Sequence, residues 1–342
     1  MMVLSMKSIP IILCAHQRSG TGALESAFEN TKKVENYGEV FYPPRGTKMK
    51  ASNYFFWINE IEPKYKLKRS MSGAEAECLL DDYLRYLDSL TNRPYFLLDI
   101  KYNSFHHIET EWHDFAQPPF LLRYAMRKKL PIIHMIRSNL FLQYFSSTYA
   151  QTTGEWHREK ESQRQEVSIN INIHHCYEAI RRAQLNTMLF RSYLDNYVHK
   201  AELIYEWTFR DNKITERASR HLYLIISQPW VRELETKKKK TNVTPSKVII
   251  NKKELQDRFR GSPYEWMISI LDGTSIIKSK QKIPQSYDFD QKEQLIDTLR
   301  NELTETSDAL SLLYQIRIWI FTRPLRAARN ICTKFWMLVR QK

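Results

Sequence analysis

The most informative stretch of the chain is IPIILCAHQRSGTGAL, residues Ile9–Leu24. Its first part, Ile9–Ala15, is a short apolar run rich in Ile and Leu, which predicts a buried β-strand. A polar turn of small residues follows, and the segment Ala23–Phe28 is the expected start of a helix. Backbone N–H groups and the positive end of the helix dipole converge at such a turn, so the stretch predicts an anion-binding site.

The polar turn supplies the side chains for this site. Gly20 and Gly22 allow the backbone to approach an anion closely. Arg18 adds a fixed positive charge, and Ser19 and Thr21 add hydroxyl donors. The turn fits neither of the nucleotide-binding patterns G-x-x-x-x-G-K-[ST] and G-x-G-x-x-G. The simpler alternative is a glycine-containing turn that only connects a strand to a helix.

A second unit of the same kind follows later in the chain. The apolar segment Pro131–Ile136 predicts a strand that runs into Arg137, and the helix after it carries Ser146 nine residues on. An arginine at a strand end can grip a phosphate with two parallel hydrogen bonds, while a hydroxyl on the helix adds a third. Asn139 is placed to assist, and Ser147 is the alternative hydroxyl. An arginine that only caps the sheet edge is the competing interpretation.

These segments resemble parts of the sulfotransferases that use 3′-phosphoadenosine 5′-phosphosulfate (PAPS). Arg18–Thr21 is similar to their 5′-phosphosulfate loop, where a basic residue followed by Ser-Gly-Thr opens the first helix. Arg137 and Ser146 resemble their 3′-phosphate grip. The segment Gly38–Phe41 is similar to a motif of the bacterial sulfotransferases that act on trehalose, nodulation factors and lipopolysaccharide sugars. The resemblance covers roughly residues 8–268, with the motifs in the family's order.

The resemblance implies a catalytic role for three residues. Glu39 would be the general base that removes the proton of the acceptor hydroxyl. Lys101, at the end of the strand expected at Tyr95–Ile100, would neutralise the bridging oxygen as the sulfuryl group leaves, together with Arg18. The competing interpretations are a solvated glutamate in a loop and a lysine that snorkels off a strand end.

Two further sets of residues are candidates on the same grounds. Sulfotransferases that act on phenols and steroids use a histidine shortly after the strand-end lysine, so His106 or His107 is the alternative base. Lys238 belongs to a run of four lysines that falls where the family closes a basic loop over the 3′-phosphate; such a run is otherwise a solvated surface. The spacing of His106, His107, Glu109 and His113 suits no metal-ligand pattern, so we expect no metal.

The expected architecture is an α/β protein with a central parallel sheet and helices on both faces, the P-loop-like sulfotransferase fold. A catalytic domain would span residues 8–270, and a C-terminal helical extension with a basic amphipathic tail would span residues 271–342. The last strand is expected at Ala201–Glu206, and residues 50–70 are expected to be an irregular loop.

The charge, aromatic and cysteine content of the chain restrict its expected partners and its expected cellular location. The chain has 342 residues and a net charge of +14, and half of that excess lies after Leu313, where seven basic residues occur without an acidic one. Because the body is only mildly basic, nucleic acid is not an expected partner. The aromatic residues of the tail favour an anionic membrane surface, although a helix packed on the body fits equally. Four widely spaced cysteines and an N-terminal apolar run too short to span a membrane favour the cytoplasm, or its membrane face.

The expected activity is therefore transfer of a sulfuryl group from PAPS to a hydroxyl, with a carbohydrate or glycolipid as the acceptor. Two alternatives stay open: a P-loop kinase that uses ATP and Mg²⁺, and a non-catalytic basic module that binds membrane or nucleic acid. The sequence also leaves a homodimer open.

Overall fold

The computed structural model describes residues 6–43, 49–65, 73–108, 117–154, 167–238 and 243–272. The expected basic tail, nearly all of the C-terminal extension, Glu109, His113 and the last two lysines of the four-lysine run lie outside the described residues. Within the described part, no helix is long and apolar enough to cross a membrane.

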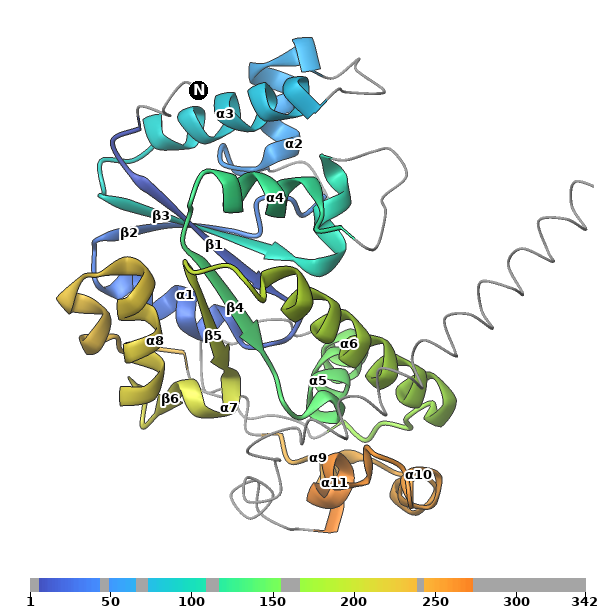
Figure 1. Ribbon diagram of the computed structural model, residues 1–342. Coiled ribbons are helices and arrows are strands. Elements are labelled where there is room, and N and C mark those ends of the chain that lie inside the picture. Colours follow the sequence, from blue (N-terminus) through green and yellow to red (C-terminus); the bar gives the residue numbers. More distant parts are fainter. Residues whose placement is uncertain are drawn as a thin grey trace, which may run out of the picture. The chain divides into compact units, whose positions relative to one another are not determined.

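A parallel sheet of five strands forms the centre of the described part, as the sequence predicts (Figure 1). The strand order is β2-β3-β1-β4-β5, and every neighbouring pair is parallel. The strands are β1 (Ile9–Ala15), β2 (Val34–Gly38), β3 (Tyr95–Lys101), β4 (Ile132–Ile136) and β5 (Lys200–Ile204). A two-residue hairpin, β6 (Phe209–Arg210) with β7 (Lys213–Ile214), follows β5.

The helices connect these strands. They are α1 (Thr21–Asn30), α2 (Tyr54–Phe56), α3 (Gly73–Ser89), α4 (Phe120–Arg127), α5 (Leu140–Thr153), α6 (Ile173–Leu194), α7 (Tyr205–Thr208), α8 (Glu216–Ile226), α9 (Pro245–Val248), α10 (Lys252–Phe259) and α11 (Glu265–Ile268).

Helices cover both faces of the sheet, and the alternation of side chains along the strands explains why (Figure 1). Ile11, Leu13 and Ala15 of β1 pack on the side of α1 and α8. Ile12 and Cys14 point to the opposite side, where α3, α4 and the end of α6 lie. Successive residues of a strand face opposite sides, so a continuous apolar run such as β1 is buried between two helical layers.

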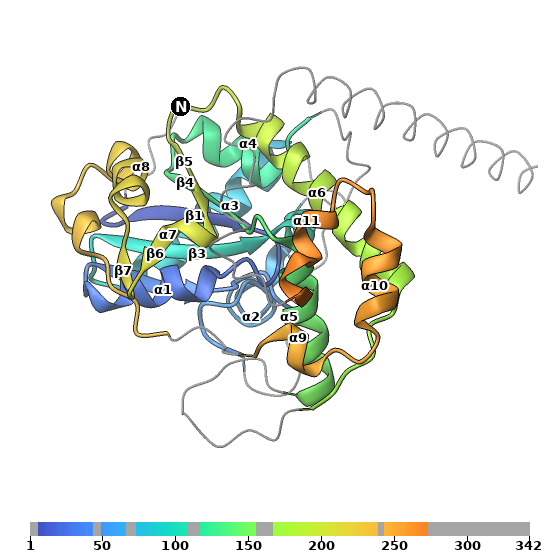
Figure 2. The same ribbon diagram turned by 90° about the horizontal axis from the view of Figure 1, so that it is seen from below.

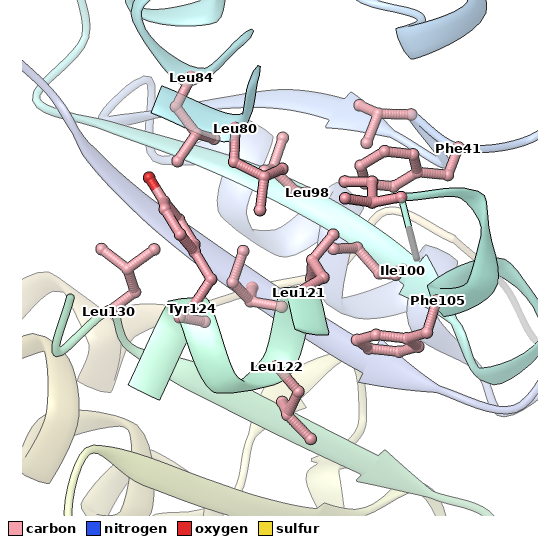
Figure 3. Close-up of a cluster of buried hydrophobic side chains, with 14 of the residues drawn as sticks. Phe41, Leu80, Leu84, Leu98, Ile100, Phe105, Leu121, Leu122, Tyr124 and Leu130 are labelled. Atoms are coloured by element: carbon pink, nitrogen blue, oxygen red, sulfur yellow. The ribbon is translucent and has the colours of Figure 1, made fainter. Parts of the chain in front are cut away.

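Figure 3 shows the core beneath α3 and α4. Leu80 and Leu84 of α3 meet Leu121 and Tyr124 of α4 over Leu98 of β3. The packing leaves a wholly apolar gap of about 10 Å³. That volume is about the smallest that can hold one water, and its lining offers no polar partner, so this is core packing and not a ligand site.

A third apolar cluster lies beside the sheet, where α5 and α6 pack with α9, α10 and α11 (Figure 2). Within this cluster, Ile169 pairs with Ile249 in an isolated parallel β-bridge. This cluster holds α5 in place, and α5 carries several of the residues of the site.

Two expectations about local structure are wrong. Residues 54–65 form short helical turns and not an irregular loop, because Tyr54 and Trp57 are buried in an aromatic cluster with Tyr83. The fifth strand ends at Ile204, and Tyr205 and Glu206 begin the helix α7. Their side chains therefore no longer alternate across the sheet but lie on one helical turn.

Candidate active site

All five strands end at the same edge of the sheet, since they are parallel. The β1–α1 loop follows β1, Glu39 follows β2, Lys101 ends β3, Arg137 follows β4, and Tyr205 follows β5. The sequence predicts four of these five positions as site residues. In open α/β sheets this edge is where ligands bind.

The β1–α1 loop approaches its neighbours closely at its glycines. Gly20 has a left-handed backbone with φ of 85°, and it precedes the first residue of α1. The ring of Tyr205 lies against it, because a Cβ atom on Gly20 would be only 2.0 Å from Cδ2 of that ring. Arg18 is also left-handed, with φ of 63°. The loop is thus a tight, non-helical turn that only glycine permits at position 20.

A glutamine on α5 braces the loop from the other side. The Nε2 amide of Gln143 donates to the backbone oxygen of Gln17 at 2.5 Å and to Oγ of Ser19 at 3.3 Å. Ser19 is 1 % exposed, so its hydroxyl holds the loop to α5 and is not directed at solvent. Gln143 is absent from the residues predicted from sequence, since an uncharged residue in a helix carries no motif.

Arg18 joins the two predicted phosphate sites. Its Nε and one terminal nitrogen donate to Oγ of Ser146, at 3.2 and 2.9 Å. Arg137 donates to the backbone oxygen of Arg18 at 3.1 Å, and its guanidinium lies over the ring of Tyr205 at 5.2 Å. The motifs predict Arg18 and the Arg137–Ser146 pair as separate grips. The structure connects the two through Arg18, whose guanidinium contacts Ser146 and whose backbone oxygen accepts from Arg137.

The positive charge of Arg137 is buried and only partly neutralised by its neighbours. Its Nε atom is buried and has no hydrogen-bond partner in the described part of the chain. Burial lowers the pKa of Arg137, and the nearby Glu206 only partly opposes this. Burial also lowers the pKa of Arg18, and the positive charge of Arg137 lowers it further. Two neighbouring guanidinium groups that repel each other would be stabilised by an anion between them.

Lys101 is the centre of a second polar cluster. Its Nζ atom, on a side chain only 3 % exposed, lies 2.8 Å from Oγ1 of Thr21, 2.5 Å from Oδ2 of Asp99 and 3.6 Å from Oε1 of Glu39. Burial by itself lowers the pKa of Lys101, but the negative charges of Asp99 and Glu39 outweigh burial and raise it. The amine therefore remains an ammonium ion.

Glu39 is the residue of its segment that projects into the site, because the residues after it are buried in the core. Val40 and Phe41 are buried in the core, and Gly38 turns the chain with a φ of 69°. The Glu39 side chain keeps 40 % of its surface exposed. Burial raises the pKa of Glu39, while the ammonium of Lys101 opposes that rise. A solvent-accessible carboxylate with a raised pKa, paired with a buried ammonium, suits a general base.

Lys238 lies beside the β1–α1 loop. A Cβ atom on Gly22 would be 2.9 Å from Nζ of Lys238, so this amine lies against the first turn of α1. The position of the lysine run in the sequence predicts a contact with the 3′-phosphate, and hence with Arg137 and Ser146. The structure shows its amine beside Gly22, and the role at the 3′-phosphate stays a prediction.

The two histidines form a separate group. His106 and His107 belong to a 3₁₀ turn, Tyr102–His107, and their rings lie 4.1 Å apart. His107 also packs against Phe55 at 5.0 Å. Burial lowers the pKa of His107 to about 4. The ring contacts found for this pair in the described residues lead to Phe55 and not to Lys101.

Other residues at this edge hold the backbone in place. Both oxygens of the Glu206 carboxylate accept backbone N–H groups, from Ser138 at 3.0 Å and from Asn139 at 3.2 Å. Asn139 caps α5, because its Oδ1 accepts the N–H of Leu142 at 2.9 Å. Its Nδ2 amide donates to the backbone oxygen of Met267 at 2.9 Å, so both side-chain atoms make structural contacts. These bonds satisfy three backbone N–H groups at the start of α5 and help to orient the helix that carries Ser146.

Asp99 is an acidic residue of the site that the motifs do not predict, although the sequence carries a signal for it. Asp99 and Lys101 are two charged residues, two positions apart, in an otherwise apolar strand. Because side chains two apart point to the same face, the pair had to meet on the side of α1.

In the described ranges, no group of three or more His, Cys, Asp or Glu side chains is arranged to hold a metal ion. No protein-family model and no curated protein matches the chain.

Proposed function

We propose that this protein transfers a sulfuryl group from PAPS to a hydroxyl group, and that the acceptor is a carbohydrate or a glycolipid. The observation that carries the proposal is the convergence of Arg18, Lys101 and Arg137 on one glycine-containing loop, with Glu39 paired to Lys101. The motif resemblance supplies the donor, and the distances support a site built for a polyanion.

The proposed reaction is an in-line displacement at the sulfur atom of PAPS. The acceptor oxygen forms a bond to sulfur while the bond from sulfur to the phosphate oxygen breaks. Glu39 takes the proton of the acceptor hydroxyl. The ammonium of Lys101 and the guanidinium of Arg18 stabilise the negative charge that moves onto the departing phosphate. The leaving product is adenosine 3′,5′-bisphosphate.

Donor selectivity is assigned to Arg137 and Ser146. Arg137 has a buried, unpartnered Nε, and Ser146 is already hydrogen-bonded by Arg18 in this structure. A phosphate bound there would provide the acceptor oxygens that Arg137 lacks. Adenosine phosphates with a second phosphate on the ribose should therefore bind more tightly than ADP.

A phosphoryl-transfer enzyme is the competing class, because Glu25 and Asp99 place carboxylates beside the loop, as a Mg²⁺ site requires. The position of Lys101 favours the sulfotransferase proposal. Its ammonium lies within 2.5 Å of Asp99 and 3.6 Å of Glu39, where a divalent cation would otherwise pair with these carboxylates.

The deciding experiment is thermal unfolding with adenosine 3′,5′-bisphosphate, ADP, or ATP with Mg²⁺. A ligand that binds only the folded protein raises the melting temperature. We expect stabilisation by the bisphosphate without metal, and a loss of that stabilisation in Arg137→Gln. Equal or greater stabilisation by ATP with Mg²⁺ would contradict the sulfotransferase proposal and favour a P-loop kinase. No stabilisation by any of the three would leave only the basic binding module.

The catalytic step is tested separately with Glu39→Gln. This variant keeps the size of the side chain and removes the base, so turnover should fall at least a hundredfold while bisphosphate binding stays unchanged. Unchanged turnover would remove Glu39 as the base and make His106→Gln and His107→Gln the next variants.

A further inference from the structure

A buried carboxylate, Asp99, lies beneath the site. Its side chain is fully buried in β3, under the first turns of α1. One oxygen, Oδ2, receives a hydrogen bond from Nζ of Lys101. The other oxygen, Oδ1, is buried and receives no hydrogen bond from an amide, amine or hydroxyl group of the described residues. A buried carboxylate oxygen without a donor is unfavourable, so it requires a partner.

The carboxyl group of Glu25 is in place to be that partner. Glu25 lies one turn after Thr21 on α1, and its carboxyl makes a side-chain hydrogen bond with Asp99. Two carboxyl groups can form that bond only if one of them carries a proton. If both were ionised, two like charges would face each other in a buried space.

The other charges that face Glu25 come from two elements. Asp99 and Lys101 lie on β3, and Lys238 lies on the segment after α8. Glu39, after β2, faces the same Lys101. Burial and the charge of Asp99 raise the pKa of Glu25 to about 8, against the opposing effect of the two lysines. The raised pKa of Glu25 thus agrees with the unpartnered oxygen of Asp99.

We propose that Glu25 and Asp99 share one proton, and that this protonated pair positions the Lys101 ammonium toward Glu39. With the proton in place, Asp99 keeps one negative charge and has both oxygens bonded, one to Lys101 and one to Glu25. Lys101 has three N–H donors, and Asp99 and Thr21 take two of them. The third is left for Glu39 and for whatever anion binds at the loop. Glu25 is therefore a positioning residue and not a catalytic one.

The shared proton does not depend on the proposed function, but its consequence for turnover rests on that function. The first test therefore uses stability alone. A group whose pKa is higher in the folded state than in the unfolded state binds a proton that the unfolded chain releases, so stability is lost as pH rises through this range. For Glu25 the range runs from about 4.5 to about 8.

Urea unfolding of the full chain should be measured between pH 5 and 8 for wild type, Glu25→Gln and the control Glu29→Gln. Glu29 lies on the same helix but is exposed. The unfolding constant of wild type, divided by that of Glu25→Gln, should increase close to tenfold per pH unit, since one proton is released. Glu29→Gln should follow wild type. A ratio that stays constant across this range would overturn the proposal.

A second measurement needs no variant. Carbon-13 NMR of protein labelled at the Asp and Glu carboxyl carbons should show one carboxyl group that stays protonated up to about pH 8. Titration of every described carboxyl group below pH 6 would contradict the shared proton.

The positioning role has its own readout in sulfuryl transfer. Wild type should lose turnover as pH rises above about 8, because the pair then gains a second negative charge beside Lys101. Glu25→Gln, which always presents an N–H donor to Asp99, should lack this decline, and Glu25→Ala should show lower turnover at every pH. An identical alkaline decline in wild type and Glu25→Gln would overturn the positioning role. If no sulfuryl transfer exists, the unfolding and NMR results still decide whether the proton is shared.

Discussion

Gly20 and the ring of Tyr205 approach each other closely in the site, and Gly20→Ala tests whether this contact matters. The added Cβ would lie 2.0 Å from Cδ2 and 2.2 Å from Cε2 of that ring. No side chain fits at these distances, so the ring or the loop must move. The backbone at this position has a φ of 85°, which alanine adopts only with strain.

Two contributions set the size of the effect. The left-handed backbone alone costs about 1 kcal/mol when glycine becomes alanine. Displacing Tyr205 adds the loss of its stacking on the guanidinium of Arg137, which is worth about 1 to 2 kcal/mol for a partly buried pair. We expect Gly20→Ala to lower the free energy of unfolding by about 2 to 3 kcal/mol. Binding of adenosine 3′,5′-bisphosphate should weaken as well, because Arg137 loses the ring that orients it.

Gly154→Ala is the matched control for this prediction. Gly154 ends α5 with a φ of 73°, but a Cβ atom there meets nothing within 4 Å. Urea unfolding should therefore show a loss of only about 1 kcal/mol, with bisphosphate binding unchanged. In the background Tyr205→Ala, the extra destabilisation by Gly20→Ala should disappear, since the ring is gone. Equal losses for Gly20→Ala and Gly154→Ala would refute the claim that Tyr205 closes on the loop.

Single contacts and one buried histidine give three more expected outcomes. Glu206→Gln removes a carboxylate that accepts two backbone N–H groups, so urea unfolding should show a loss of about 1 to 2 kcal/mol, and an unchanged midpoint would contradict the role of these bonds. Ser146→Ala should weaken calorimetric binding of adenosine 3′,5′-bisphosphate by about threefold to tenfold, and Ser147→Ala should not; the reverse result would assign the contact to Ser147. Burial lowers the pKa of His134. Below about pH 6.5 the unfolded chain therefore binds a proton at this histidine, whereas the folded chain keeps the ring neutral. Between pH 6.5 and 5, the stability of wild type relative to His134→Gln should therefore fall by up to about 1.4 kcal/mol per pH unit. Parallel unfolding curves for the two proteins would exclude this histidine as the cause.

Much of the fold follows from local sequence. The apolar runs at β1, β3 and β4 are short and bounded by polar turns, so they specify buried strands before any contact is known. Parallel strands then end at one edge, which is why Arg18, Lys101 and Arg137 could be expected together from their places at strand ends. Glu39 follows the same rule at the end of β2.

The roles of the residues between these positions depend on packing that no motif encodes. Gln143 reaches the loop only because α5 lies against it, and Tyr205 covers Gly20 only because β5 ends earlier than expected. Lys238 lies at Gly22 through a segment more than 200 residues away in the sequence. Contacts between residues so far apart in the sequence depend on tertiary packing and leave no periodic pattern in the local sequence.

The parallel sheet, the glycine-containing turn and the positive charges at the strand ends can all be predicted from local sequence, because they depend on the alternation of side chains and on turn chemistry. How those charges are paired becomes visible only in the folded chain. Folding places Lys101 between Asp99 and Glu39, links Arg18 to Ser146, and sets Glu25 against Asp99. The energy of a charge depends on its burial and on its neighbours within a few ångströms, and both are properties of the packed chain.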